Sequence, residues 1–199
     1  MIPYVASDPH FKHKKIVEHC HRPANHEELI YKGYQTVGKG NLLICLGDVS
    51  MGQEEEVANE YIIPLECRKV LVLGNHDHKS WSWYMNHGWD FVCEQFKMVY
   101  AGKVILFSHK PQPWDGDWEV NVHGHLHNLP QLSHHSKEYK QLQSWHKLYS
   151  AELQDYKPVR LDTFIQTGEI KNPKLDIKEP LEVNRNIKFP PAENAQKFC

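Results

Sequence analysis

Short apolar runs, each closed by glycine or polar residues, recur along the first two thirds of the chain. Runs of about 4–8 apolar residues bounded by turn-forming residues are typical of buried β-strands. The pattern predicts strands over residues 2–6, 42–46, 70–73, 96–100, 104–107 and 119–122. Ala101-Gly102-Lys103 separates the fourth run from the fifth, which predicts a hairpin there.

Helix-like patterning lies between these strands, over residues 14–21, 27–37 and 54–66. Pro23 breaks the first of these segments from the second, and Asn25 is the predicted N-cap of the second. Strands that alternate with helices indicate an α/β layered domain.

The character of the chain changes after residue 128. Residues 129–147 are mostly polar and predict an exposed helix or loop insertion, whereas residues 149–164 return to strand-like patterning that would close a sheet. Residues 168–199 are rich in Pro, Lys, Asn and Glu without periodicity, which predicts an irregular C-terminal tail. The expected organisation is therefore one domain over residues 1–167 followed by that tail.

Composition narrows the class of protein. A chain of 199 residues with 40% hydrophobic residues can bury one core, and it has no apolar run near the roughly 18 residues that cross a bilayer. Asp8 and His10 come so early that we expect no leader before them. Five scattered cysteines without a CxxC pair predict reduced thiols and a cytoplasmic location. A net charge of −2 gives no strong signal for a nucleic-acid partner.

Histidine occurs 15 times, and many of these residues follow the predicted strands. In open α/β sheets, ligands bind beyond the carboxyl ends of the strands, so side chains at these ends should meet. Asp, Asn and His are all competent metal ligands. The residues in such positions are Asp8, His10, Asp48, Asn75, His109, His125 and His127.

These residues form five blocks in the order DxH, GD, GNHD, H and GHxH. The order resembles that of the calcineurin-like metallophosphoesterase family over roughly residues 2–128. Residues 7–16 and the later phrase Tyr156-Lys157-Pro158-Val159 further resemble a subgroup of small, uncharacterised bacterial and phage phosphoesterases. The resemblance implies an α/β fold, a four-layer αββα sandwich with two mixed β-sheets.

The resemblance also implies a role for each ligand. Asp48 would bridge two divalent cations lying about 3.5–4 Å apart. The first cation would be held by Asp8, His10 and His127, and the second by Asn75, His109 and His125. Mn²⁺ is the foremost candidate, and Fe²⁺, Zn²⁺ and Ni²⁺ also suit these ligands.

The implied reaction is hydrolysis of a phosphate diester or monoester by attack of a metal-bridging hydroxide. By resemblance, the catalytic residues are His76, which would donate a proton at the leaving group, and Asp77, which would orient the His76 ring. A helix-capping role for Asp77 is the alternative.

His13 and Arg22 lie in a segment rich in lysine and histidine. They belong either to a solvated basic helix face or to a site that contacts the substrate phosphate. The expected partner is a small phosphoester, with a nucleotide among the candidates and no membrane.

Two departures from relatives bear on function: the first disfavours a phosphoprotein substrate, and the second disfavours a ferric–tyrosinate metal centre. Gly47-Asp48-Val49-Ser50-Met51-Gly52 lacks the Asp-Arg pair that protein serine/threonine phosphatases carry after this block. Met51 stands where purple acid phosphatases place a tyrosine ligand. A nuclease or nucleic-acid-end phosphatase remains an alternative, as does a non-catalytic metal-binding scaffold, and the sequence leaves the oligomeric state open.

Overall fold

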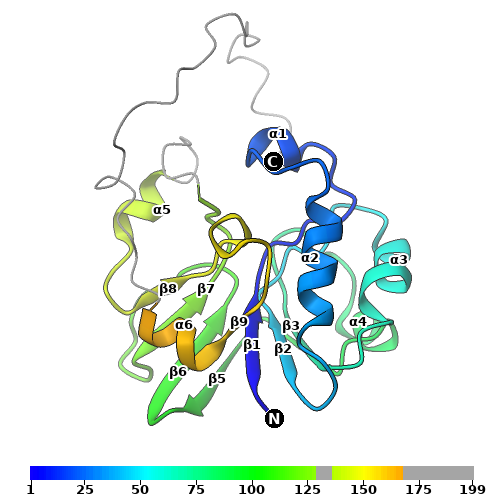
Figure 1. Ribbon diagram of the computed structural model, residues 1–199. Coiled ribbons are helices and arrows are strands. Elements are labelled where there is room, and N and C mark those ends of the chain that lie inside the picture. The colour runs from blue at the N-terminus through cyan, green and yellow to red at the C-terminus, as the bar shows by residue number, and fades with distance from the viewer. Residues whose placement is uncertain (129–135, 168–199) are drawn as a thin grey trace, which may run out of the picture.

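The computed structural model describes residues 1–128 and 136–167, which form two β-sheets packed face to face (Figure 1). The first sheet has five strands in the order β4-β3-β2-β1-β9. Its strands are β1 (Pro3–Ala6), β2 (Leu42–Cys45), β3 (Arg68–Val72), β4 (Phe91–Cys93) and β9 (Val159–Arg160). β1 to β4 are parallel, and β9 joins β1 antiparallel, so the sheet is mixed.

The second sheet has four strands in the order β5-β6-β7-β8. Its strands are β5 (Gln95–Tyr100), β6 (Lys103–Ser108), β7 (Val120–His123) and β8 (His146–Leu148). β5 and β6 form the predicted antiparallel hairpin, whereas β6, β7 and β8 are parallel. Parallel strands run in the same direction, so their carboxyl ends lie at one edge of each sheet.

The core lies between the sheets and beneath the helices of the first one. Val5, Ile44 and Leu71 of the first sheet and Ile105 and Phe107 of the second belong to one buried apolar cluster. Because strands covered on both faces lose their alternation, this burial explains why they read as continuous apolar runs.

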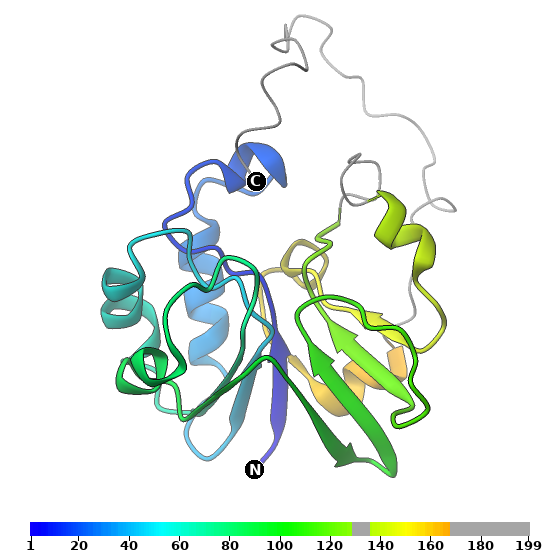
Figure 2. The same cartoon turned by 180° about the vertical axis from the view of Figure 1, so that it is seen from behind.

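The helices α2 (His26–Gln35), α3 (Glu54–Val57) and α4 (Trp81–Asn86) lie on the side of the first sheet (Figure 2). The other helical segments are α1 (Ile16–His19), the π-helical turn η1 (Ala58–Ile62), α5 (Ser136–Gln141), the 3₁₀ turn η2 (Ala151–Gln154) and α6 (Leu161–Thr167). The expected α/β fold with two mixed sheets and helices is thus confirmed. No helix of the described residues is long and apolar enough to cross a membrane.

Three local predictions need correction. β4 was not predicted, because Phe91–Cys93 is too short to show a period. The strand expected over residues 149–164 is instead η2, the two-residue β9 and α6. Asn25 occupies the N-cap position of α2, but its side chain accepts no capping hydrogen bond. The described part of the expected insertion, residues 136–147, contains α5 and the first two residues of β8, whereas residues 129–135 and the predicted tail lie outside the described residues.

Candidate metal centre

The predicted ligands lie in loops that leave the carboxyl ends of β1, β2, β3, β6 and β7. These loops continue the parallel pairing of the strands before them, because Asp8 N–H donates to Gly47 O and His10 N–H donates to Asp48 O. Gly124 N–H likewise donates to His109 O, 3.0 Å away. Main-chain hydrogen bonds therefore fix the loops that carry ligands from distant parts of the sequence.

Left-handed backbone is concentrated at these loops. The φ angles of Asp8, His10, Asp48, His125 and His127 lie between 50° and 70°. Each such residue without glycine's freedom costs about 1–2 kcal/mol, so the conformation persists only where surrounding structure enforces it. Strained backbone at so many predicted ligands favours a functional site over a packing role.

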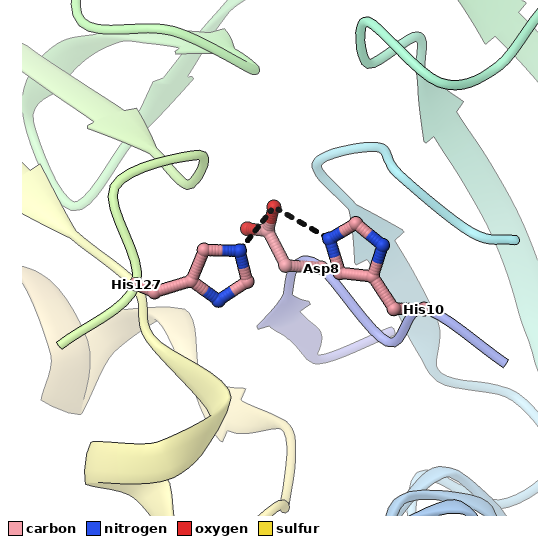
Figure 3. A group of neighbouring side chains, drawn as sticks. All are labelled: Asp8, His10 and His127. Atoms are coloured by element: carbon pink, nitrogen blue, oxygen red, sulfur yellow. Dashed lines mark ion pairs between the residues drawn. The ribbon is translucent and has the colours of Figure 1, made fainter. Parts of the chain in front are cut away.

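The first ligand set consists of Asp8, His10 and His127, all buried (Figure 3). Their ligand atoms lie within 4.8 Å of one another. His10 Nε2 is 3.8 Å from Asp8 Oδ1, and His127 Nε2 is 3.9 Å from the same oxygen. The two imidazoles thus approach one carboxylate oxygen from different loops, as Figure 3 shows.

The second set gathers around His109. Its Nε2 is 3.0 Å from Asn75 Oδ1 and 3.2 Å from His125 Nδ1, while its Nδ1 is 2.6 Å from Leu46 O. Asp48, His109 and His125 also bring ligand atoms within 4.8 Å of one another.

Asp48 lies between the two sets. Its Oδ2 is 3.8 Å from His10 Nε2 and 3.4 Å from His109 Nε2. Its Oδ1 accepts a 2.9 Å hydrogen bond from His76 N–H, which fixes the carboxylate plane. One carboxylate therefore faces imidazoles of both sets.

The donor set fits divalent cations. Asp8 Oδ1 and His10 Nε2 are buried without a hydrogen-bond partner, an arrangement that is costly unless another group satisfies them. Metal–ligand bonds of about 2.0–2.2 Å separate neighbouring ligand atoms by roughly 3–3.5 Å. The observed separations of 3.4–3.9 Å approach that spacing.

Electrostatics at the site favour positive charge. Burial disfavours the charged Asp48 carboxylate, but hydrogen bonding to His109 and the charges of His109 and His10 hold its pKa well below the usual range. Burial likewise disfavours a charged His109, yet Asp48 and Asp8 raise its pKa to about 9. The carboxylates therefore create a field that stabilises a cation at this position.

Arg22 is buried, and its guanidinium faces acceptors of the protein itself. Its Nη1 donates to Pro9 O and its Nη2 to Asp8 O, both at 2.8 Å, and its Nε donates to Glu152 Oε1 at 2.8 Å. These contacts occupy the guanidinium with protein acceptors, and its side chain is 0% exposed. The arrangement favours a structural position over the phosphate contact suggested by the sequence.

Asp77 also differs from its expected position. Its carboxylate accepts main-chain hydrogen bonds from Asp48, Val49 and Gly74, at 2.8, 3.0 and 2.8 Å. Burial and the nearby Asp48 charge raise the pKa of Asp77 to about 6, against those hydrogen bonds. No hydrogen bond of the described residues joins it to the His76 ring, so Asp77 ties the GD and GNHD loops together instead.

His76 and His13 flank the first set. The His76 side chain is 22% exposed, and its Nε2 is 3.9 Å from Asp48 Oδ2. The His13 ring lies 5.3 Å from that of His10, and the His76 ring lies 5.7 Å from it. Burial, followed by the nearby charges of His76 and other cations, lowers the pKa of His13 to about 4, so its ring is neutral at pH 7.

Sequence reasoning missed two glutamates that contact ligand histidines. Glu152 Oε1 is 3.2 Å from His127 Nδ1, and Glu138 Oε2 is 3.7 Å from His125 Nε2. Tyr139 donates hydrogen bonds to the carbonyls of Leu126 and His127. All three lie after the last motif block, in segments with no pattern that pointed to the site.

Comparison with known proteins agrees with this geometry. The model of the family described as calcineurin-like phosphoesterase matches residues 4–182. An uncharacterized protein of Methanocaldococcus jannaschii, MJ1445, is 28% identical over 180 residues, which cover 83% of this chain and 90% of that protein.

A solved structure shows the same fold. The protein of unknown function AQ665 from Aquifex aeolicus superposes with a TM-score of 0.65 at 24% identity, covering 83% of this chain and 98% of AQ665. The nuclease MPE of Pseudomonas putida is more distant, with a TM-score of 0.41 at 17% identity over 63% of this chain and 61% of the nuclease. The loops described above bring together two groups of potential metal ligands, and the family model matches most of the chain. The chain therefore belongs to the calcineurin-like phosphoesterase family and is a metal-dependent phosphoester hydrolase.

Proposed function

We propose that the protein hydrolyses a small phosphate diester or monoester at a site that holds two divalent cations. Asp8, His10 and His127 would bind the first cation, Asn75, His109 and His125 the second, and Asp48 both. Bound together, such ions polarise a phosphate ester and make water a nucleophile near neutral pH.

The observation that carries this proposal is the position of Asp48. Its Oδ2 faces His10 Nε2 at 3.8 Å and His109 Nε2 at 3.4 Å, so one oxygen points toward both ligand sets. The potential ligand atoms also form two separate groups, one with Asp8, His10 and His127 and one with Asp48, His109 and His125, as two ions would require.

Charge supports catalysis by this arrangement. Asp8 and Asp48 are the two carboxylates among the ligands and would offset two of the four positive charges on two divalent ions. The remaining positive charge would attract a phosphate and stabilise charge that develops on its oxygens.

His76 is the proposed proton donor to the leaving group. Its N–H to Asp48 fixes its main chain, and its ring is the more exposed of the imidazoles near Asp48 Oδ2. His13, neutral and adjacent to His10, is the proposed contact for a phosphate oxygen. Asp77 would hold in place the loops that carry Asp48 and Asn75, because its carboxylate accepts main-chain hydrogen bonds from both loops.

The mixed nitrogen and oxygen ligands suit Mn²⁺ first, with Fe²⁺, Zn²⁺ and Ni²⁺ as further candidates. A nucleotide is one candidate among the small phosphoesters.

Hydrolysis of bis-p-nitrophenyl phosphate and p-nitrophenyl phosphate tests the proposal, with metal-free protein and with added Mn²⁺. We expect metal-dependent turnover, and the ratio of the two rates identifies diester or monoester preference. Asp48→Asn should lower kcat/KM by about 10³-fold, which corresponds to several kcal/mol of lost charge stabilisation. Asp115→Asn is a matched control, because Asp115 is exposed and its carboxylate lies near Lys97. Two bound ions without turnover of either substrate, or full turnover by Asp48→Asn, would contradict the proposal.

A further inference from the structure

A buried ion pair lies behind the first ligand set, outside the family motif blocks. Arg22 Nη2 is 2.8 Å from Glu152 Oε1, and the two side chains are 0% and 4% exposed. Arg22 precedes α2 and Glu152 lies in η2, so the pair joins segments that are 130 residues apart. Burying two charges is expensive, and it is repaid only by close geometry and further hydrogen bonds.

The glutamate side of this pair fixes His127. Glu152 Oε1 is 3.2 Å from His127 Nδ1, and Ser150 Oγ donates to Glu152 Oε2 at 2.6 Å. An ionised carboxylate only accepts hydrogen bonds, so Nδ1 must carry the proton. The lone pair of His127 is then on Nε2, the atom that faces Asp8 Oδ1.

The arginine side fixes the other two ligands of the set. Arg22 donates to the carbonyls of Asp8 and Pro9, within the Asp8-Pro9-His10 turn. Asp8 and His10 have φ angles of 53° and 50°, a conformation that needs external support. One ion pair therefore contacts the ring of one ligand and the strained turn that carries the other two.

A second interpretation of the same residues fails on charge. Cys20, His127 and Glu152 bring potential ligand atoms within 4.8 Å of one another, as a separate cation site would. The Arg22 guanidinium already supplies a positive charge at hydrogen-bond distance from Glu152, so a further cation there would be repelled.

We propose that the Arg22–Glu152 ion pair is the positioning element of the first metal site, setting the tautomer of His127 and the turn that presents Asp8 and His10. This inference rests on the proposed two-ion site and assigns roles to residues beyond its ligands. Such outer-shell partners commonly change metal affinity by about 10–100-fold when they are replaced.

The test measures Mn²⁺ affinity at each site separately, by calorimetric titration of metal-free full-length protein. In a His125→Ala background, which removes a ligand of the second site, Glu152→Gln should weaken the remaining first site by about 10–100-fold. In a His127→Ala background, Glu152→Gln should leave the second site unchanged. Glu28→Gln is the matched control, because it neutralises an exposed glutamate paired with Lys32.

Equal losses at both sites would mean that Glu152 supports only the fold, and an unchanged first site would overturn the proposal. If Glu152→Gln does not fold, Ser150→Ala removes one hydrogen bond to the same carboxylate. It should weaken the first site alone, and an effect at neither site or at both would also overturn the proposal. Wild-type protein that binds two ions without hydrolysing either nitrophenyl substrate would contradict the proposed function while leaving the positioning role intact.

Discussion

The two halves of the metal centre are built differently. In the first half, Asp8, His10 and His127 are buried, and a buried ion pair holds them from behind. In the second half, His109 is buried, but Asn75 is exposed. The side chains of His125 and His127 are about equally exposed, at 11% and 10%. The carboxylate behind His125, Glu138, is 34% exposed, compared with 4% for Glu152 behind His127.

The difference predicts unequal affinities for the two cations of the proposed site. The buried half has a carboxylate of its own, Asp8, in addition to the shared Asp48, so it should bind its cation more tightly. The open half has the neutral Asn75 as its proposed oxygen ligand, and the carboxylate behind its His125 is partly exposed. We therefore expect it to bind its cation more weakly than the buried half.

The largest expected effect concerns His76. His76→Ala should lower kcat by about 10²–10⁴-fold, the usual contribution of a positioned acid or base. Metal content should stay at the wild-type level, because His76 is not one of the predicted ligands. Elemental analysis of the purified variant checks this, and loss of metal would show that His76 helps to hold the metal. His87→Ala is a control histidine variant, because His87 is the C-cap residue of α4 and is not one of the predicted site residues.

Two glycines allow the halves to be disturbed selectively. A Cβ on Gly124 would contact Ser7 Oγ and Asp8 Oδ2, whereas a Cβ on Gly74 would contact Asp48 Oδ1 and lie 2.9 Å from Asp48 Cγ. Gly124→Ala should therefore weaken mainly the first site, and Gly74→Ala should weaken both, by about 10–100-fold. Calorimetric Mn²⁺ titration distinguishes the two patterns.

Gly102→Ala is the control for this pair, since nothing lies within 4 Å of its added Cβ. Its φ of +75° makes it cost some stability without changing either metal affinity. Identical metal profiles for Gly124→Ala and Gly74→Ala would remove the distinction between the halves.

Removal of metal should proceed in order. With increasing chelator, we expect one Mn²⁺ to leave at a free metal concentration about tenfold higher than the other, because the second half has fewer carboxylates and greater exposure. Asn75→Ala should lose the weaker ion and keep the tighter one. Electron paramagnetic resonance of the Mn²⁺ that stays bound tests this order. Loss of the tighter ion in Asn75→Ala would show that the second half is the one that binds its cation more tightly.

The smallest effect is expected at Glu138. Its 3.7 Å contact with His125 is longer and more exposed than that of Glu152 with His127, so water screens it more strongly. Glu138→Gln should weaken the second site only about two- to threefold, less than Glu152→Gln weakens the first. A larger loss for Glu138→Gln would show that both halves depend equally on their carboxylates.

Much of the fold could be read from the chain because its strands are short, apolar and separated by turn residues. The runs near Val5, Ile44 and Ile105 form strands in the structure, with ends shifted by at most one residue. The strand predicted over residues 149–164 is wrong because Tyr149, Leu161 and Phe164 are apolar side chains that are buried in the core without forming one continuous strand. β4 gave no signal, since three residues gain their pairing only from the neighbouring β3.

The metal centre shows the same difference between what the sequence predicts and what the structure adds. The sequence by itself determined which residues are the candidate metal ligands, because these residues follow strands whose carboxyl ends share an edge. They are Asp8, His10, Asp48, Asn75, His109, His125 and His127. Only the tertiary structure decided how those residues are supported, since Arg22 and Glu152 meet across 130 residues of chain. Local patterns record hydrophobic burial and turn geometry, whereas a contact between distant buried charges exists only once the core has closed around them.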